Sequence, residues 1–114
     1  MSTAKVHCLK VLKGVRDMHQ RNLVHNDLKP SNIMFFGEGV TWKLIDLDET
    51  QREAEGSATR FTPSYAPPEF LMAVHNGDSV PLSRSSKDMW SFGVIAFEVI
   101  TSITTSHPLL STEE

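Results

Sequence analysis

Cysteine, clustered basic residues and long apolar runs are all scarce in this sequence. Its 114 residues include a single cysteine, Cys8, which excludes an intrachain disulfide and is typical of a reducing compartment. The net charge of −3 and the scattered lysines and arginines exclude the basic surface that binds nucleic acids or anionic membranes. The longest strongly apolar run, residues 90–100, carries Glu98 and is too short to span a bilayer. Because no signal-peptide pattern opens the chain, we expect one soluble domain in the cytoplasm.

Hydrophobic periodicity predicts two long helices and one short one. Over residues 4–21, apolar side chains recur at spacings of three and four. Residues 86–101 carry apolar side chains in almost every direction around the helix axis, which is typical of a helix in an interior. Pro68 favours the start of a short helix over residues 69–74, and residues 76–78 are expected to form a turn.

A β-hairpin is predicted between the first helix and the short one. Two apolar runs of β-favouring residues, 33–36 and 40–45, flank a turn at residues 37–39 that contains two glycines. Residues 23–24 are expected to be a short extended segment. Residues 47–64 are polar, have no useful periodicity and are expected to form a loop. The predicted fold class is therefore α+β, mainly helical, with one small hairpin.

The residues that carry chemistry lie in one run of eight and in an aspartate fourteen positions later. The run is His25-Asn26-Asp27-Leu28-Lys29-Pro30-Ser31-Asn32, and the later aspartate is Asp46. This set provides the groups that phosphoryl transfer to a hydroxyl requires. One carboxylate takes the hydroxyl proton, an ammonium steadies the phosphoryl oxygens, and an amide with a second carboxylate holds the metal ions. The hairpin should bring Asn32 and Asp46 to the same end of two paired strands.

The five specified residues of the run, His-x-Asp-x-Lys-Pro-x-Asn, are expected to occur by chance in a chain of this length with a probability on the order of 10⁻⁵ to 10⁻⁴. Three further motifs occur in order along the chain. These are Asp46-Leu47-Asp48, Pro67-Pro68-Glu69 and Asp88-Met89-Trp90-Ser91-Phe92-Gly93. Together the four motifs resemble the His-Arg-Asp, Asp-Phe-Gly, Ala-Pro-Glu and Asp-x-Trp-Ser-x-Gly motifs of the C-terminal lobe of a eukaryotic-type protein kinase. The resemblance covers residues 4 to about 102.

The resemblance implies that residues 1–114 are a partial protein kinase domain. It places a catalytic loop at residues 25–32, a metal-binding motif at 46–48, an activation segment at 46–69 and a central helix at 86–101. The N-terminal lobe and the final helices of the fold would be absent. A protein substrate and ATP are the implied partners.

The resemblance also assigns a role to each site residue. Asp27 would be the base and Lys29 the phosphate contact. Asn32 and Asp46 would bind Mg²⁺, and Met34 would lie beneath the adenine of ATP. The expected structural residues of the catalytic loop, activation segment and central helix are His25, Leu47, Thr62, Glu69 and Asp88. 

Two residues favour the serine/threonine class within this family. Lys29 stands where tyrosine kinases usually carry Ala or Arg. Thr62 lies three residues before Tyr65, and its hydroxyl can bridge Asp27 and Lys29.

Three residues depart from the family pattern without removing a reacting group. Asn26 replaces the Arg that normally pairs with a phosphorylated activation loop, and a neutral amide cannot make that contact. Leu47 replaces a Phe of the hydrophobic spine. Asp48 replaces a Gly, with loss of backbone freedom, although Asp tolerates a left-handed conformation better than most residues.

The six glycines form no Gly-x-Gly-x-x-Gly, so the phosphate loop of the family is not found in this sequence. The apolar helix 86–101 also needs more cover than the rest of the chain offers. We therefore expect either a missing N-terminal lobe or a partner to cover it. A pseudokinase-like scaffold module and an inactive gene fragment remain alternatives to a truncated catalytic domain. A small-molecule kinase of the aminoglycoside type is disfavoured by Lys29-Pro30 and by the two later motifs.

Several of these polar residues also have simpler, structural interpretations. Asp88 could cap the helix that starts near Ser85 as well as bind the catalytic loop. His25 is expected to be a packed histidine rather than a base. His7 and Cys8 are adjacent on a helix and do not face together, which disfavours a zinc site. The loop also offers hydroxyls for phosphorylation, at Thr50, Ser57, Thr59 and Thr62.

Overall fold

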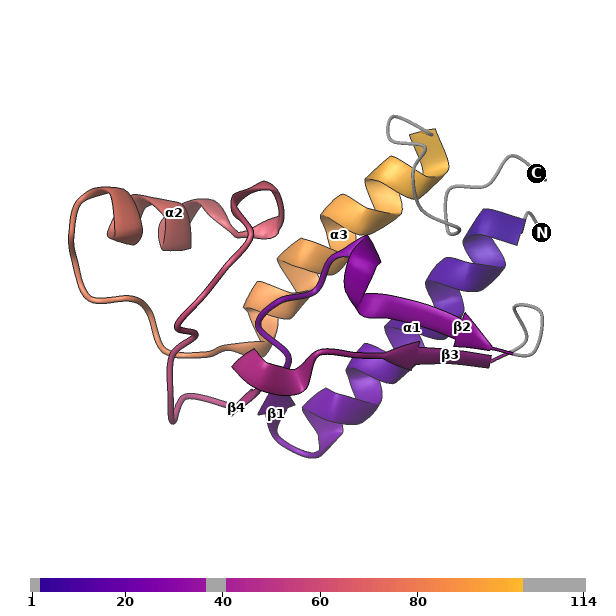
Figure 1. Cartoon of the computed structure of the whole chain (residues 1–114), viewed down its shortest axis with the longest axis horizontal. Helices are drawn as coiled ribbons and strands as arrows, with labels where there is room; N and C mark the ends of the chain where they lie inside the picture. Colours follow the sequence, from indigo (N-terminus) through magenta and orange to yellow (C-terminus); the bar gives the residue numbers. More distant parts are fainter. Residues whose placement is uncertain (1–2, 37–40, 102–114) are drawn as a thin grey trace.

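The computed structural model describes residues 3–36 and 41–101 (Figure 1). Its helices are α1 (Thr3–Gln20), α2 (Pro68–His75) and α3 (Ser85–Thr101), with single 3₁₀ turns η1 (Pro30–Asn32), η2 (Leu47–Glu49) and η3 (Pro63–Tyr65). Its strands are β1 (Leu23–Val24), β2 (Ile33–Phe36), β3 (Thr41–Leu44) and β4 (Gln51–Arg52). The mainly helical α+β class predicted from the sequence is therefore correct. None of the helices in the described part of the chain is long and apolar enough to cross a membrane.

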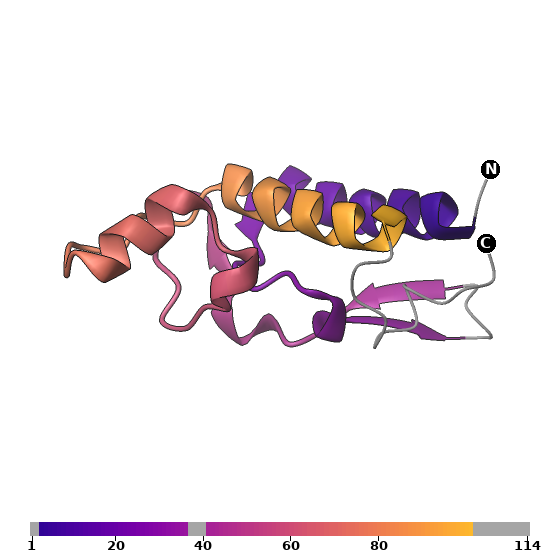
Figure 2. The ribbon, with the colours of Figure 1, turned by 90° about the horizontal axis from the view of Figure 1, so that it is seen from above.

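Helices α1 and α3 lie side by side and form one layer, and the hairpin of β2 and β3 forms a second (Figures 1 and 2). Each of these helices contributes two core residues that are four positions apart in the sequence and therefore lie on the same side of the helix. The core that joins the two layers consists of Val11, Val15, Leu28, Ile33, Ile95 and Val99, each at most 3% exposed. Burial of one such side chain stabilises the fold by about 1.5–3 kcal/mol. The core therefore fixes Leu28, in the loop over residues 25–32, between the helices and the hairpin.

Strands β2 and β3 form the predicted antiparallel hairpin, with Ile33 opposite Leu44. The pairing extends one step beyond this pair, because the N–H of Ile45 donates to the carbonyl oxygen of Asn32 at 2.9 Å. Asn32 and Asp46 consequently lie at the same end of the hairpin, as predicted. The expected turn at residues 37–39 lies outside the described residues.

The prediction of a plain loop over residues 47–64 was wrong in part. Strand β4 pairs with β1 in an antiparallel two-residue ladder, with Leu23 opposite Arg52. The N–H of Glu53 adds a bond to the carbonyl oxygen of Asn22 at 2.9 Å. A strand of two residues is too short to show any periodicity, so its existence depends on the partner strand and could not be inferred from the local pattern.

Helix α2 begins at Pro68, as predicted, because proline lacks an N–H that the first helical turn would leave unpaired. It ends at the expected turn. There Gly77 takes a positive φ of 72°, and the N–H of Asp78 bonds the carbonyl oxygen of Ala73 at 2.9 Å. Helix α2 projects from the two layers rather than packing into them (Figures 1 and 2).

Helix α3 is apolar on more than one side, and only part of it is covered. Ile95 and Val99 face the core, whereas Trp90, Phe97 and Ile100 are 46%, 50% and 59% exposed. The described part of the chain therefore leaves apolar surface of α3 open, as expected from the sequence.

Candidate active site

The run of residues 25–32 forms a loop that leads from β1 to β2, and His25 anchors it from within. Its side chain is completely buried. Nδ1 of the ring lies 3.1 Å from the N–H of Asp27, and Nε2 lies 3.0 Å from the carbonyl oxygen of Ile45. Nδ1 accepts and Nε2 donates in this arrangement, which defines one neutral tautomer. His25 thus joins the loop to the residue before Asp46, and it is a packed residue as expected.

Asp88 at the first turn of α3 holds the same loop from the opposite side. Its carboxylate is 1% exposed and accepts the N–H of His25 at 2.8 Å and that of Asn26 at 3.0 Å. One of its oxygens also lies 2.9 Å from Nε2 of His19 on α1. Of the two interpretations made from the sequence, binding of the loop backbone is the one that these hydrogen bonds bear out. In the capping interpretation Asp88 would accept the N–H of Ser85, but this N–H donates to the carboxylate of Glu53 at 2.8 Å.

The polar side chains of Asp27, Lys29 and Thr62 contact one another. Nζ of Lys29 lies 2.9 Å from Oγ1 of Thr62, and this hydroxyl donates to Oδ1 of Asp27 at 3.2 Å. Lys29 also lies 3.7 Å from Oδ2 of Asp27. The side chains of Asp27 and Lys29 are 14% and 28% exposed. The structure therefore brings together a carboxylate, an ammonium and the hydroxyl that the sequence predicted between them.

Asn32 is buried and turned toward Asp27. Its amide nitrogen donates to the carbonyl oxygen of Asp27 at 2.7 Å and lies 3.4 Å from Oδ2 of the same residue. These bonds use the nitrogen, and the amide oxygen, which is the atom that can bind a cation, takes no part in them. Oxygen donors of this kind suit Mg²⁺.

Asp46 follows β3 in a left-handed conformation, with φ 56° and ψ 73°, and its side chain is exposed. Asp48, which stands in place of the glycine of the family motif and was expected to lack its backbone freedom, lies within the 3₁₀ turn η2, and the positive φ belongs to Asp46. Aspartate accepts this conformation at a lower cost than most residues, because its short polar side chain can bond locally.

Three other predicted site residues are exposed in the described structure. Met34 on β2 is 45% exposed, and Leu47 in η2 is 55% exposed. Glu69 is an exposed residue in the first turn of α2, where a carboxylate is favourable next to the helix N-terminus.

The segment that carries Thr62 is held on α3. The hydroxyl of Ser91 donates to the carbonyl oxygen of Tyr65 at 2.5 Å, and the hydroxyl of Tyr65 donates to Glu98 at 2.7 Å. Burial, together with the adjacent Glu98 carboxylate, raises the pKa of Tyr65, so its hydroxyl stays protonated. These bonds fix η3, and the N–H of Tyr65 in turn bonds the carbonyl oxygen of Thr62 at 3.0 Å.

Sequence reasoning missed Glu49, which organises the segment that follows it through contacts with residues 59 and 60. Its carboxylate is buried and accepts the N–H groups of Thr59 and Arg60 at 2.6 and 3.0 Å. It also bonds Oγ1 of Thr59 at 3.0 Å and Nε of Arg60 at 3.1 Å. Burial raises the pKa of Glu49, but the hydrogen bonds from Arg60 and Thr59 outweigh this and lower it to about 2. No rule of spacing relates Glu49 to residues ten and eleven positions later, so the sequence held no usable signal.

Lys87 and Ser83 were also missed, and both contact Asn26. The amide nitrogen of Asn26 donates to the carbonyl oxygen of Glu49 and to the hydroxyl of Ser83, each at 2.8 Å. Nζ of Lys87 donates to the carbonyl oxygen of Asn26 at 3.0 Å. Asn26 is therefore part of a buried polar cluster.

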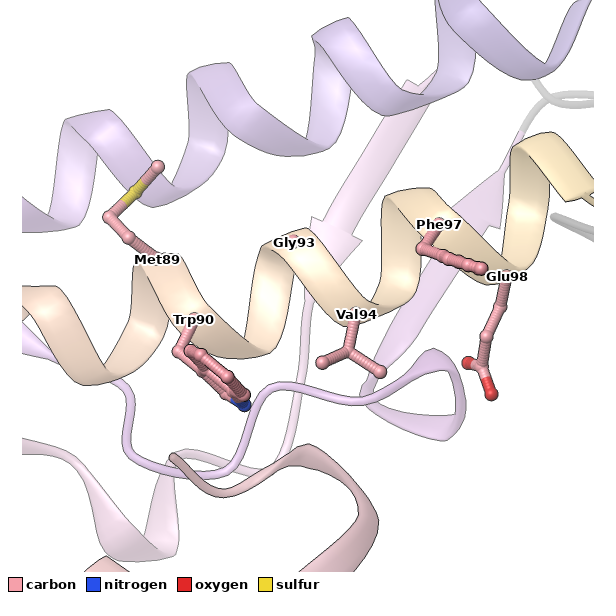
Figure 3. Close-up of a pocket in the computed structure, with 6 residues that line it drawn as sticks. All are labelled: Met89, Trp90, Gly93, Val94, Phe97 and Glu98. Carbon is pink, nitrogen blue, oxygen red and sulfur yellow. The ribbon is translucent and has the colours of Figure 1, made fainter. Parts of the chain in front are cut away.

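A groove of about 430 Å³ lies along α3, apart from the predicted catalytic and metal-binding residues (Figure 3). Trp90, Val94 and Glu98 project from the same side of the helix, one turn apart (Figure 3). Among the described residues, the groove is lined by Met89, Trp90, Gly93, Val94, Phe97 and Glu98, and none of these is a predicted catalytic or metal-binding residue. Among residues 3–36 and 41–101, no group of three or more His, Cys, Asp or Glu side chains is arranged to hold a metal ion.

Comparison with known proteins agrees with this architecture. The family model described as "Protein kinase domain" matches residues 1–112. The chain is 34% identical over 94 residues to serine/threonine-protein kinase nekl-2 of Caenorhabditis elegans, an alignment that covers 80% of this chain and 24% of the relative. It is 36% identical over 101 residues to a protein of Drosophila melanogaster named death-associated protein kinase related, which covers 83% of this chain and 14% of the relative.

Among solved structures, the Cydia pomonella Granulovirus kinase PK-1 superposes with a TM-score of 0.69 and 24% identity. The match covers 83% of this chain and 33% of that chain, and at this identity it shows a common fold. The chain spans a quarter or less of the length of the two curated relatives above. The family match over almost the whole chain and the identity to known kinases establish that this chain belongs to the protein kinase family.

Proposed function

We propose that this chain is the catalytic-loop portion of a protein serine/threonine kinase and corresponds to the C-terminal lobe of the kinase domain. The intact protein would transfer a phosphoryl group from ATP to serine or threonine side chains of protein substrates. The observation that carries the proposal is the Thr62 hydroxyl, which lies between Nζ of Lys29 and the carboxylate of Asp27.

In this proposal Asp27 acts as the base. Its side chain is only 14% exposed, and its carboxylate is oriented by the Thr62 hydroxyl and by the amide of Asn32. A substrate hydroxyl that reaches a carboxylate oxygen can pass its proton to it as the oxygen attacks the phosphoryl group. Lys29 lies next to this point and offers positive charge to the transferred phosphoryl oxygens.

Asn32 and Asp46 are the residues that would hold Mg²⁺. Their donor set fits the ion, because one supplies an amide oxygen and the other an exposed carboxylate, both at the same end of the hairpin. Bound Mg²⁺ would neutralise charge on the phosphates of ATP and hold them in line for transfer. Met34, on the strand that follows Asn32, would contact the adenine ring.

The serine/threonine class rests on the same two side chains, Lys29 and Thr62. A lysine next to the base keeps a point charge where the phosphoryl group is transferred, and its bond to Thr62 fixes that charge in place. This feature distinguishes the proposal from a tyrosine kinase, whereas Lys29-Pro30 and the two later motifs argue against a small-molecule kinase.

The test of this function is phosphoryl transfer by the full-length protein to three peptide pools that differ only in the acceptor residue, Ser, Thr or Tyr. We expect incorporation of radiolabelled phosphate into the Ser and Thr pools and at least about tenfold less into the Tyr pool. Preferred labelling of Tyr would contradict the assignment to this class. Binding of ATP without transfer to any pool would favour a pseudokinase-like scaffold instead.

A further inference from the structure

A buried lysine of α3 contacts the catalytic loop. Lys87 is 7% exposed, and its ammonium donates to the carbonyl oxygen of Asn26 at 3.0 Å and lies 3.4 Å from the side-chain oxygen of the same residue. The ammonium also lies 4.2 Å from the ring centroid of Phe70 on α2. The cation is thus surrounded by two oxygen dipoles and an aromatic face.

Burial of an ammonium is costly unless the surroundings compensate for the lost water. Burial lowers the pKa of Lys87, while the negative charges of Asp88, Asp27 and Glu49 oppose this effect. A cation–π contact with Phe70 adds a further favourable term. An uncharged side chain of similar length would fill the same space without this cost, so the charge requires an explanation beyond packing.

The position of the bond supplies this explanation. The carbonyl oxygen that Lys87 binds belongs to the peptide unit that joins Asn26 to Asp27. The N–H of that same peptide unit donates to Nδ1 of His25 at 3.1 Å. The preceding N–H, of Asn26, donates to Asp88 at 3.0 Å. Adjacent residues of α3, one cationic and one anionic, therefore hold the backbone directly before Asp27.

The backbone of Asn26 is in the left-handed region. It has a positive φ of 75°, a conformation that asparagine accepts at a lower cost than most residues with a side chain. The side chain of Asn26 is itself neutral, and Lys87 supplies a cation next to its backbone carbonyl oxygen.

We propose that Lys87 is a positioning residue, whose ammonium fixes the peptide unit between Asn26 and Asp27 and thereby orients the Asp27 carboxylate for catalysis. The inference rests on the proposed function, in which Asp27 is the base. It assigns no contact with substrate to Lys87. Its consequence is that the loop is held in its active geometry by a charge on α3.

The experiment compares the full-length protein with three variants: Lys87→Met, which removes the charge, Lys87→Arg, which keeps it, and Lys13→Met, which removes an exposed lysine of α1 as a control. We expect Lys87→Met to lower kcat at least about tenfold with KM for ATP changed by less than about threefold, because small errors in position are costly in this chemistry. Lys87→Arg should restore kcat to within about threefold of wild type, and Lys13→Met should not change it. Unchanged kcat in Lys87→Met would overturn the inference.

Amide hydrogen exchange gives a readout that does not need activity. In Lys87→Met, exchange at Asn26, Asp27 and Leu28 should be at least about tenfold faster, while exchange within α1 stays at its wild-type rate. Equal acceleration throughout the molecule, or none at the loop, would show a structural role and overturn the inference. If Lys87→Met does not fold, Lys87→Gln keeps a donor without the charge, and wild-type kcat and loop exchange in that variant would overturn it.

Asp27→Asn, measured in parallel, separates this inference from the proposed function. Loss of activity in Asp27→Asn together with wild-type behaviour of Lys87→Met would contradict only the role of Lys87. Retained activity in Asp27→Asn would contradict the proposed function. The exchange rates at the loop would then still decide whether Lys87 fixes its backbone.

Discussion

The carboxylate of Glu49 accepts both the backbone N–H and the hydroxyl of Thr59, at 2.6 and 3.0 Å. A buried carboxylate thus holds the backbone at residues 59 and 60. The amide of Asn26 joins the same cluster through the carbonyl oxygen of Glu49. The segment therefore carries its own negative charge, and neutral Asn26 is compatible with that arrangement.

The first prediction is that activity of the full-length protein does not require phosphorylation of the activation segment. Asn26 offers no bidentate cationic contact to a phosphate, and Glu49 already bonds Thr59. The combined variant Thr50→Ala, Ser57→Ala, Thr59→Ala should keep kcat within about tenfold of wild type. A larger loss that Glu at one of these positions restores would show that another cation performs the role of the missing arginine.

The second prediction concerns the pH dependence of stability. The pKa of Glu49 is lowered in the fold to about 2 from an ordinary value of 4.5. A lowered pKa means that the contribution is complete above about pH 5 and is lost as the pH falls from there toward 2. The lowered pKa corresponds to a contribution of Glu49 to the free energy of unfolding on the order of 3 kcal/mol at neutral pH. Urea unfolding at several pH values should show this loss in the wild type.

Glu49→Gln and the control Glu55→Gln, which changes an exposed residue of the same segment, test the assignment. Glu49→Gln should lower stability at pH 7 and flatten the acid dependence, whereas Glu55→Gln should do neither. An acid profile that is identical in wild type and Glu49→Gln would show that a different group causes the loss.

The third prediction is that Ile95 is a main contributor to stability. It is 1% exposed and belongs to the buried core cluster that also contains Val11 and Val15 of α1 and Ile33 of β2. Ile95→Ala should lower the free energy of unfolding by about 2–5 kcal/mol, because it removes buried surface and leaves a cavity. The matched control is Ile100→Ala on the same helix, where 59% exposure predicts a change below about 1 kcal/mol. Equal losses at the two positions in denaturant titrations would mean that the described core is wrong.

The fourth prediction is that residues 1–114 alone self-associate through α3. Trp90 and Phe97 are about half exposed along the groove of Figure 3. Concentration-dependent size in analytical ultracentrifugation and binding of an apolar dye are the expected observations. Trp90→Ser with Phe97→Ser should reduce both. A wild-type chain that is strictly monomeric at all concentrations and binds no dye would contradict this prediction.

The long elements were predictable from the sequence because their signals are local. The periodicity of α1, the proline at the start of α2 and the two apolar runs of the hairpin each specify their element without reference to the rest of the chain. The bridge of Thr62 to Lys29 and Asp27 joins residues 33 and 35 positions apart, and it was expected only because of the resemblance to kinases.

The polar cluster behind the loop was not predictable because every contact in it joins residues far apart in the chain. Glu49 and Lys87 look like ordinary charged residues in the sequence, and charged residues are rarely buried. Their burial depends on partners such as Asn26, which lies 61 positions from Lys87. The short strand β4 exists for the same reason, since only its partner β1 defines it. Such features require the tertiary structure.

The fifth prediction tests the central claim, that Asp27 is the base of a phosphoryl-transfer site. The measurement is kcat for transfer of radiolabelled phosphate from ATP by the full-length protein and its Asp27→Asn variant, with Asp78→Asn in the exposed turn after α2 as control. We expect Asp27→Asn to lower kcat by about two to four orders of magnitude, because an amide cannot take the proton of the attacking hydroxyl. Asp78→Asn should keep the wild-type rate. A rate for Asp27→Asn within about threefold of wild type, from a correctly folded protein, would contradict the account.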